Sequence, residues 1–499
     1  MKQSTCLGNK DCVKNSWDFA DVFRFQFKVT RQKESPCDTW LTNKVGQWHA
    51  HHCPDLPCCE LYDGKGKRLG LVLGYAVDDE GTFLSEKARL SKVKTLQDLE
   101  TYIEGLAGRF LVLVSAFEAD RVYFDPTAGL SAVLSEKDGG LASSVHLLVS
   151  RDIVPEPAVD VADVLARKAQ FLLGETCDAH CRRVYANHYV DLNSMTMVRH
   201  WPKSDVGFED SRYTRGEAAT EISSRLSQII SALAKGTSVA LPLSSGTDSR
   251  ILLAASTSSL GDIDEFYVHD IYFITRFDRE GAQMLSDAVG VDLTVIDAQS
   301  AKFMSVMTQE EEDDLRRKMA VRTSLSFNGI DSRTVRAVSL TPKTALVMRG
   351  NVAEMTRANK WTHATARHGA TPRDGLAALL NMRAEHLEDR VEPGRLVELT
   401  ERYEAWADTL PLGARKRIPD MAHAEVFMPG APNNVYYAFT RNFYINPFND
   451  RRLLELTAWF PPLARRRRKL VNKIIAHSAP DLAKLPYLKE LKEEYKKSA

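Results

Sequence analysis

The sequence predicts two folded parts in series, a β-rich α+β part followed by an α/β part with a parallel sheet. With 499 residues, the chain is too long for a single hydrophobic core. Short β-branched or aromatic runs dominate residues 20–200. Strand-like and helix-like runs alternate after residue 214, and the pattern is mostly helical after residue 360.

The composition is that of a globular protein, with 44% hydrophobic and 26% charged residues. Basic and acidic residues number 66 each, so no net basic field attracts nucleic acid. No apolar run reaches the roughly 18–20 residues that span a bilayer, and the polar N-terminus lacks the apolar core of a secretion signal. Eight cysteines are few for this length, so we expect a reducing, cytoplasmic location without membrane partners.

In the first part, Gly, Asp and Pro punctuate short apolar runs, as is typical of antiparallel sheets. The strands expected from these runs cover residues 68–77, 108–117, 120–125 and 143–150. Apolar residues at helical spacing predict helices over residues 95–107 and 161–174.

The second part begins with a long amphipathic pattern over residues 214–236, where Gly236 is the candidate C-cap. Strands are expected over residues 238–243, 262–273, 291–297 and 344–350, and further helices over residues 249–256 and 278–290. Strands and helices in turn predict a parallel sheet that is covered on both faces.

A loop of small residues, LPLSSGTDSR, joins the first of these strands to its helix. A helix N-terminus offers unpaired N–H groups and partial positive charge, and Gly246 lets an anion approach the backbone. Asp248 would repel a bare phosphate, so it indicates Mg²⁺ travelling with nucleotide phosphates. The lysine of a Walker loop is missing. The alternative interpretation is a simple helix cap by Ser244, Ser245 or Asp248.

The order of motifs resembles that of the asparagine synthetase-like ATP pyrophosphatases. LSSGTDSR is similar to their S-G-G-x-D-S pyrophosphate loop, and FYVHDIYF resembles the strand that lies beside the adenine. ALVMRGNVAEM falls where the family has S-G-E-G-x-D-E. NPFNDRRLLELTAWFPP is similar to the family's P-F-L-D segment, and a Lys-rich helix follows it.

The N-terminal part resembles the glutaminase half of the same family. LAGRFLVLVSAFEADRVYFDPTAGLSAVL is similar to its central strands, and VYANHYVDLNSMTMVRHWP resembles its linker hairpin, whereas residues 1–90 match poorly. The resemblance implies an N-terminal-nucleophile (Ntn) hydrolase-like sandwich, degenerate and amidotransferase-like, over residues 1–205. It implies an α/β ATP pyrophosphatase domain with a helical C-terminal part over residues 214–499.

A glutaminase of this class attacks with a cysteine at the mature N-terminus, whose α-amine is the base. The chain begins Met1-Lys2-Gln3, and Cys6 and Cys12 lie further in. We therefore expect no glutaminase activity, as in the β-lactam synthetases and lasso-peptide cyclases that the chain resembles.

The resemblance implies an AMP-forming, ATP-dependent amide ligase that adenylates a carboxylate, with ATP and Mg²⁺ as cofactors. Asp248 and Glu354 would bind the metal, and Lys469, with Lys473 as a near alternative, would stabilise the transition state together with Asp248. The partner would be a small molecule or peptide that carries a carboxylate and an amine, and the chain is a possible homodimer. The implied ATP-binding residues are Leu243, Ser244, Ser245, Gly246, Thr247, Asp248, Ser249, Val268 and Gly350.

Three departures from the family pattern keep other functions open. Ser245 replaces a glycine, Glu354 stands where an aspartate is usual, and FYINPFND lacks the charged residues that line the acceptor pocket. One alternative is a decayed synthetase fold that acts as a nucleotide-binding or scaffolding partner, and another is an asparagine synthetase-type amidotransferase. A tRNA-modifying enzyme is disfavoured, because no RNA-binding module is evident.

The stretch WHAHHCPDLPCCE contains enough nitrogen and sulfur ligands for zinc, but their intervals are not the paired spacings of zinc sites. Cys177 and Cys181 flank His180 in a similarly local group. We expect packing roles and no bound zinc at both places. The residues of the first group are His49, His51, His52, Cys53, Cys58 and Cys59.

Overall fold

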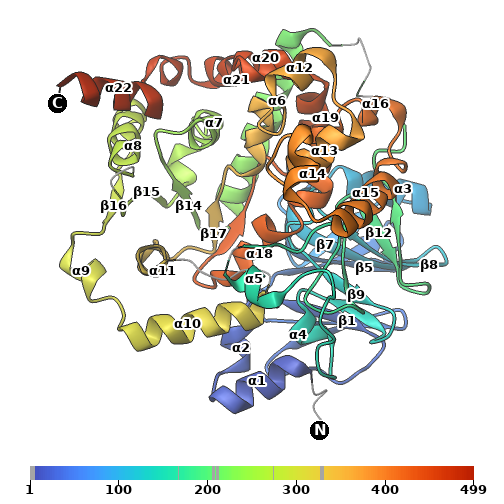
Figure 1. Ribbon diagram of the computed structural model, residues 1–499. Helices are drawn as coiled ribbons and strands as arrows, with labels where there is room; N and C mark the ends of the chain where they lie inside the picture. Colours follow the sequence, from blue (N-terminus) through green and yellow to red (C-terminus); the bar gives the residue numbers. More distant parts are fainter. Residues whose placement is uncertain are drawn as a thin grey trace.

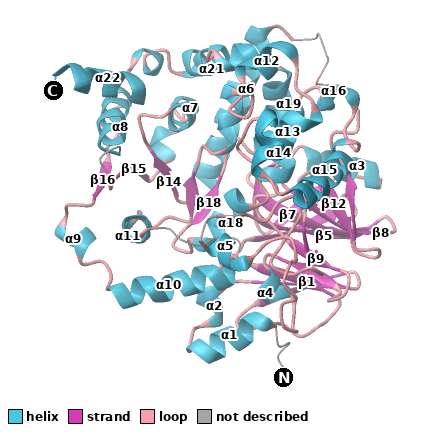
Figure 2. Cartoon of the chain, in the orientation of Figure 1, coloured by secondary structure: helices cyan, strands magenta, loops and turns pink. Residues whose placement is uncertain are grey.

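The computed structural model describes residues 6–166, 168–204, 208, 213–272, 275–325 and 331–498, and its strands form three sheets (Figures 1 and 2). Two sheets are built from the chain before residue 200 and one from the chain after it. The six-stranded sheet has the order β11 (Arg182–Arg183), β9 (Val133–Ser135), β10 (Gly140–Ala142), β1 (Phe27–Thr30), β3 (Trp48–His52) and β2 (Leu41–Val45). The seven-stranded sheet has the order β13 (Thr196–Arg199), β12 (His188–Asp191), β8 (Ala119–Phe124), β7 (Ala107–Ala116), β5 (Arg68–Val77), β4 (Cys58–Asp63) and β6 (Lys87–Leu90).

These two sheets face each other across one apolar core, and helices cover their outer faces. Alternate residues of a strand point to opposite sides, so Leu71 and Leu73 of β5 pack into the shared core, whereas Val72 packs outward. The helices α1 (Leu7–Asn15), α2 (Phe19–Val22) and α4 (Val145–Leu148) lie on the six-stranded sheet. The helix α3 (Leu96–Glu104) covers the other sheet. The layers therefore run helix, sheet, sheet, helix.

The third sheet is parallel and has helices on both faces, as the alternation of strands and helices predicted. Its order is β16 (Thr294–Asp297), β15 (Glu265–Asp270), β14 (Val239–Pro242), β17 (Leu346–Met348) and β18 (Phe443–Ile445). One face packs against α6 (Arg215–Gly236), α7 (Thr247–Ala255), α8 (Thr275–Val289) and α21 (Lys469–Ser478). The other face packs against α9 (Ala301–Met304), α11 (Ser332–Leu340) and α18 (Ala431–Ala438).

After residue 360 the described chain is mostly helical, as the sequence indicated. The remaining helices of the molecule are α5 (Val161–Leu165), η1 (Leu260–Asp262), α10 (Gln309–Arg322), η2 (Val352–Arg357), α12 (His363–His368), α13 (Pro372–Leu379), η3 (Ala384–His386), α14 (Leu387–Arg390), α15 (Pro393–Ala407), α16 (Leu412–Arg415), α17 (Ile418–Ala422), η4 (His423–Phe427), α19 (Arg451–Trp459), α20 (Pro462–Arg466), η5 (Leu482–Lys484) and α22 (Leu488–Ser498). No helix in the described ranges is long and apolar enough to cross a membrane.

Three local predictions were wrong. The expected strand over residues 143–150 contains the buried helix α4, because a short apolar run does not distinguish a strand from a buried helical turn. The helix expected over residues 161–174 ends at Leu165 in α5. Gly236 is the last residue of α6, and Thr237 is the C-cap. Glycine is required at position 236 for packing, since a Cβ there would lie 2.5 Å from the Phe83 ring. Met1–Gln3 and most of the boundary between residues 205 and 214 lie outside the described residues.

A buried guanidinium joins the two halves of the molecule. Arg451, the first residue of α19, is 2% exposed. It donates three hydrogen bonds to the N-terminal half: Nε to Asn187 Oδ1 at 2.9 Å, Nη2 to the Phe124 carbonyl at 2.7 Å and Nη1 to the Ile103 carbonyl at 3.3 Å. Every acceptor is neutral, so the cation replaces the water that would otherwise solvate these three oxygens.

Neighbouring side chains extend this junction. Asn449 Nδ2 donates to the Gly108 carbonyl and to Asp125 Oδ1, both at 2.6 Å. Asp125 is fully buried, and it also accepts the backbone N–H groups of Phe110, Thr127, Gly129 and Leu130. The loop after β18 is therefore bound to the loop that closes β8.

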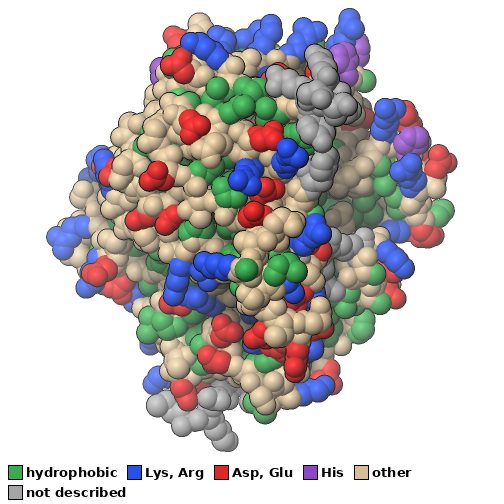
Figure 3. All heavy atoms as spheres, turned by 90° about the vertical axis from the view of Figure 1, so that its left-hand side faces the viewer, with side chains coloured by type: hydrophobic (Ala, Val, Ile, Leu, Met, Phe, Trp, Pro, Cys, Tyr) green, Lys and Arg blue, Asp and Glu red, His purple; other side chains and the backbone are tan. Residues whose placement is uncertain are grey.

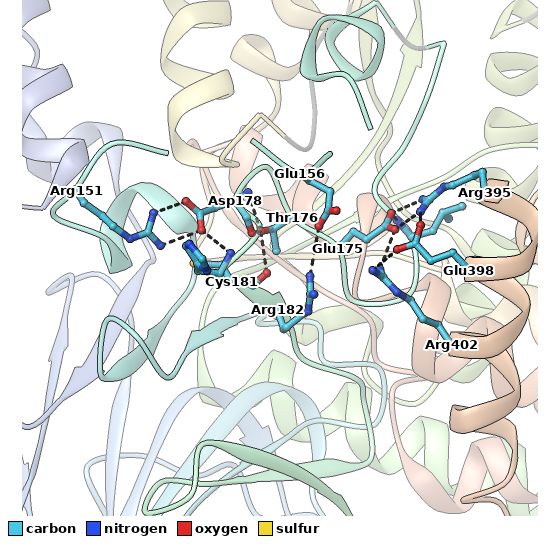
Figure 4. A network of polar contacts seen from close by, with 12 residues as sticks. Arg151, Glu156, Glu175, Thr176, Asp178, Cys181, Arg182, Arg395, Glu398 and Arg402 are labelled. Atoms are coloured by element: carbon cyan, nitrogen blue, oxygen red, sulfur yellow. Dashed lines mark hydrogen bonds and ion pairs between the residues drawn. The ribbon is translucent and has the colours of Figure 1, made fainter. Parts of the chain in front are cut away.

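A second junction involves α15 and is drawn in Figure 4. The carboxylate of Glu175 is fully buried and accepts from Arg395 Nη2 at 2.6 Å and from Arg402 Nη1 at 2.9 Å. A buried carboxylate is stable only when it is paired in this way. Glu175 therefore fixes the helical C-terminal part against the N-terminal half.

We expect Arg451→Met to destabilise the protein by about 3 kcal/mol, because the change removes the charged donor that three buried oxygens share. Arg452→Met is the matched control on the same helix. Its guanidinium is 29% exposed in its pairing with Glu221, so this change should cost less than about 1 kcal/mol. Urea unfolding followed by circular dichroism measures both. Equal midpoints for the two variants would contradict the structural role of Arg451.

Candidate functional site

A cavity of about 350 Å³ opens at the carboxyl ends of β14, β15 and β17, and we call it the strand-end cavity. The sheet order changes direction beside it, because β15 and β16 lie on one side of β14 whereas β17 and β18 lie on the other. Ligands of open parallel sheets bind at such a point. The lining residues are Pro242, Leu243, Ser244, Asp248, Ser249, Leu252, Val268, His269, Thr275, Asp278, Met348, Arg349, Gly350, Asn351 and Glu354.

The N-terminus of α7 forms one wall of the cavity. Gly246 occupies the N-cap and has no side chain to cap the first turn, so the helix N–H groups remain available to a ligand. Ser244 and Ser249 hold the loop together through a contact of 2.9 Å between their hydroxyl oxygens. This wall has the backbone groups and the hydroxyls that the sequence predicted for phosphate binding.

Ser245, which was expected among the ATP-binding residues, is absent from the described lining of the cavity. Its Oγ donates to Asp278 Oδ1 at 2.7 Å, and its backbone N–H donates to the same oxygen at 3.2 Å. Gly281 of α8 leaves room for this arrangement, since a Cβ there would lie 2.5 Å from Ser245 Cβ. Both donors of Ser245 are therefore engaged. Gly246 and Thr247 are also absent from the described lining of the cavity.

Asp248 lies on the first turn of α7 and lines the cavity. Its Oδ2 accepts from Arg357 Nη2 at 2.7 Å, whereas Oδ1 is buried and has no hydrogen-bond partner in the described part of the chain. Burial raises the pKa of this carboxyl to about 6. Arg357 opposes the rise, and the charge of Glu354 adds to it.

Glu354 lies opposite Asp248 on η2. Its Oε1 is 3.3 Å from His423 Nε2, and its Oε2 accepts from Asn359 Nδ2 at 2.7 Å. Burial acts to raise its pKa, but the interaction with His423 and the positive charges of Arg357 and Lys360 outweigh this effect and hold the pKa below its usual value. The structure thus brings together the two carboxylates that the sequence paired, one with a raised pKa and one with a lowered pKa.

Gly350 allows these two walls to approach each other. A Cβ on Gly350 would lie 2.7 Å from Asp248 Cβ, so any side chain would push the loop after β17 away from α7. An apolar wall is close by, since Leu243 and Val268 are each 2% exposed. Pro242, Leu252 and Met348 complete that wall.

The sequence analysis missed the cations of this site, Arg349 and Arg357. Arg349 directly follows β17, and its guanidinium lies beside the rings of Tyr267, Tyr436 and Tyr444. Its position in the sequence, between a buried strand and a glycine, could have indicated that Arg349 lies at the edge of the sheet where ligands bind. Arg357 meets Asp248 because η2 packs against α7, and no sequence pattern indicates that contact.

Lys469 and Lys473 are not brought to the cavity. Both are exposed on α21, whose buried residues Leu470, Val471 and Ile474 pack toward the parallel sheet. A row of Lys and Arg side chains runs along the upper edge of the molecule in Figure 3, at the height of α20 to α22 in Figure 1. The described lining of the cavity includes neither lysine, because the helical period directs them away from the face that packs.

Of the histidines near residue 50, His51 and His52 have other partners. His51 contacts Thr42 Oγ1 at 2.9 Å and the Gln32 carbonyl at 3.1 Å through its two ring nitrogens. Cys177 and Cys181 are fully buried in the core outside the six-stranded sheet. Within the described ranges, no group of three or more His, Cys, Asp or Glu side chains is arranged to hold a metal ion.

No protein-family model matches this chain, and no curated protein matches it. The chemistry of the strand-end cavity must therefore be inferred from the residues that line it.

Proposed function

We propose that this chain is an AMP-forming, ATP-dependent amide ligase and that the strand-end cavity is its nucleotide site. One observation carries the proposal. The cavity combines an uncapped helix N-terminus, an apolar wall and two carboxylates, one of which has a buried oxygen without a described partner. Each of these three features is complementary to one part of a magnesium nucleotide.

The phosphates would lie at the N-terminus of α7, where backbone N–H groups and the hydroxyls of Ser244 and Ser249 can donate to them. The adenine would lie against Leu243 and Val268, since an aromatic base is stabilised by an apolar surface. The cavity volume of about 350 Å³ is within the range of small-molecule sites.

The carboxylates fit a divalent cation. Asp248 Oδ1 has no hydrogen-bond partner among the described residues, and Asp248 is close enough to Glu354 for the two charges to interact. Mg²⁺ prefers hard oxygen ligands and takes the rest of its ligands from phosphate and water. Asp248 and Glu354 would hold the ion, and the ion would neutralise phosphate charge.

The proposed reaction forms an amide in two displacements. A carboxylate oxygen of the substrate attacks the α-phosphorus of ATP and pyrophosphate leaves. An amine then attacks the acyl carbon and AMP leaves with the bond electrons, while the amine loses a proton. An amine on the same substrate gives this second step the advantage of proximity.

The fold supports the same proposal. The four layers of the N-terminal half agree with an Ntn-hydrolase-like sandwich over residues 1–205. The strand order of the parallel sheet agrees with an ATP pyrophosphatase domain over residues 214–499. These finer assignments rest on the resemblance of the motifs.

A second candidate is a nucleotide-binding protein without turnover. The contact between Arg357 and Asp248 favours it, because a guanidinium already occupies one carboxylate oxygen at the metal site. Exchange of labelled pyrophosphate into ATP, measured with candidate carboxylate substrates, separates the two functions. If the protein binds ATP but catalyses no exchange with any of the substrates tested, the second candidate is supported.

We expect Mg-ATP to bind the protein and Asp248→Asn to weaken binding at least tenfold, about 1.4 kcal/mol, because the amide cannot neutralise the metal. Calorimetry with a non-hydrolysable ATP analogue and Mg²⁺ measures the affinity. Asp297→Asn, at the end of β16, is the control and should bind as the wild type does, since Asp297 does not line the cavity. No binding by the wild type would contradict the proposed function.

Binding should also depend on pH through Asp248. Its pKa is raised to about 6, so lowering the pH through this value protonates the carboxyl that the metal requires. We expect the affinity for Mg-ATP to fall about tenfold for each pH unit below 6. The phosphates of ATP also titrate in this pH range. Asp248→Asn is the matched reference, because its pH dependence contains the contribution of ATP but not that of the Asp248 carboxyl. Parallel profiles for the two proteins would show that Asp248 does not hold the metal.

The chain should not hydrolyse glutamine. Cys6 is fully buried, burial raises the pKa of its thiol, and the next N–H, that of Leu7, donates to the Val149 carbonyl at 2.7 Å. A nucleophilic thiol must be accessible and ionised. Glutamate released from glutamine, with and without Mg-ATP, is the measurement. Production that exceeds a heat-killed control and disappears in Cys6→Ala would favour the amidotransferase alternative.

A further inference from the structure

Arg349 occupies a distinctive position in the strand-end cavity. It is the first residue after β17, and the alternation along that strand places its side chain on the face of Val347, away from Leu346 and Met348. On the same face lie Tyr267 of β15 and Tyr444 of β18, to either side of it. Arg349 therefore projects between two tyrosines at the edge where the strands end.

The surroundings of Arg349 hold the guanidinium in place. Its carbon lies 5.9 Å from the centroid of the Tyr444 ring, and Tyr436 is stacked on Tyr444 with a centroid separation of 5.6 Å. The hydroxyl of Tyr436 in turn donates to Asn351 Oδ1 at 2.9 Å, and Asn351 also lines the cavity. A cation held over aromatic rings keeps its N–H groups available for another partner.

Arg349 lacks the carboxylate partner that a half-buried arginine usually has. Within the part of the chain that the structure describes, no Asp or Glu forms an ion pair with Arg349, and no side-chain hydrogen bond of its guanidinium is found. Arg357, by contrast, is paired with Asp248. His269 also lines the cavity, but burial and, to a smaller extent, the charge of Arg349 lower its pKa to about 4, so this ring is neutral at pH 7.

We propose that Arg349 binds the phosphate oxygens of ATP and supplies the positive charge that the exposed Lys469 and Lys473 do not bring to the cavity. This assignment rests on the proposed function. A guanidinium presents a planar set of donors that matches phosphate geometry, and charge-assisted hydrogen bonds are about twice as strong as neutral ones.

The test compares three variants of the full chain by calorimetry with a non-hydrolysable ATP analogue and Mg²⁺. We expect Arg349→Met, which preserves length and removes charge, to weaken binding at least tenfold, about 1.4 kcal/mol. Arg349→Lys keeps the charge but loses the planar donors, so its affinity should lie between those of the wild type and Arg349→Met. Arg279→Met is the matched control, because Arg279 pairs with Asp270 at the same end of the sheet but does not line the cavity.

Two outcomes would overturn the inference. Wild-type affinity in Arg349→Met would show that the guanidinium does not contact the nucleotide. An affinity of Arg349→Lys as low as that of Arg349→Met, with unfolding midpoints equal to that of the wild type, would show that positive charge at this position does not contribute to binding. Failure of the wild type itself to bind Mg-ATP is a separate result, which contradicts the proposed function.

Discussion

The arrangement of the strand-end cavity depends on the buried guanidinium of Arg451. Its three hydrogen bonds anchor the start of α19 to the N-terminal half, and Asn449 adds two more just before it. These residues follow β18, which pairs in register with β17. The loop after β17 carries Gly350 and Glu354, so one buried polar junction fixes the edge of the sheet from which half of the cavity is built.

The N-terminal half also supports the cavity through Arg109 of β7. Arg109 is buried and donates to the Gly129 carbonyl at 2.8 Å and to the Tyr444 carbonyl at 3.2 Å, while its guanidinium lies 5.2 Å from the Tyr436 ring. Tyr436 and Tyr444 are the rings that surround Arg349. This contact gives the N-terminal half a structural role that does not depend on glutaminase activity, because its removal would expose the back of the site.

The sequence predicted much of the fold but only part of the candidate site. Alternating runs predicted the parallel sheet, and small residues at a strand end predicted the wall around Ser244 and Asp248. Lys469 was expected in the site because the linear order of motifs does not determine which face of α21 packs. Arg349 and Arg357 were missed because their roles depend on contacts between elements far apart in sequence. Helix α4 shows the same limit, since four buried apolar residues suit either a strand or a helix.

The charges of the cavity are better explained by binding than by stability. Asp248 and Arg349 line one cavity, yet they do not form an ion pair with each other. Asp248 forms its ion pair with Arg357. Leaving a buried carboxylate oxygen without a partner costs free energy on folding, and the burial that raises the pKa of Asp248 acts in the same direction. A ligand that carries a cation for the carboxylate and an anion for the guanidinium would satisfy both groups at once. A magnesium nucleotide has this distribution of charge, whereas a free phosphate would satisfy Arg349 and repel Asp248.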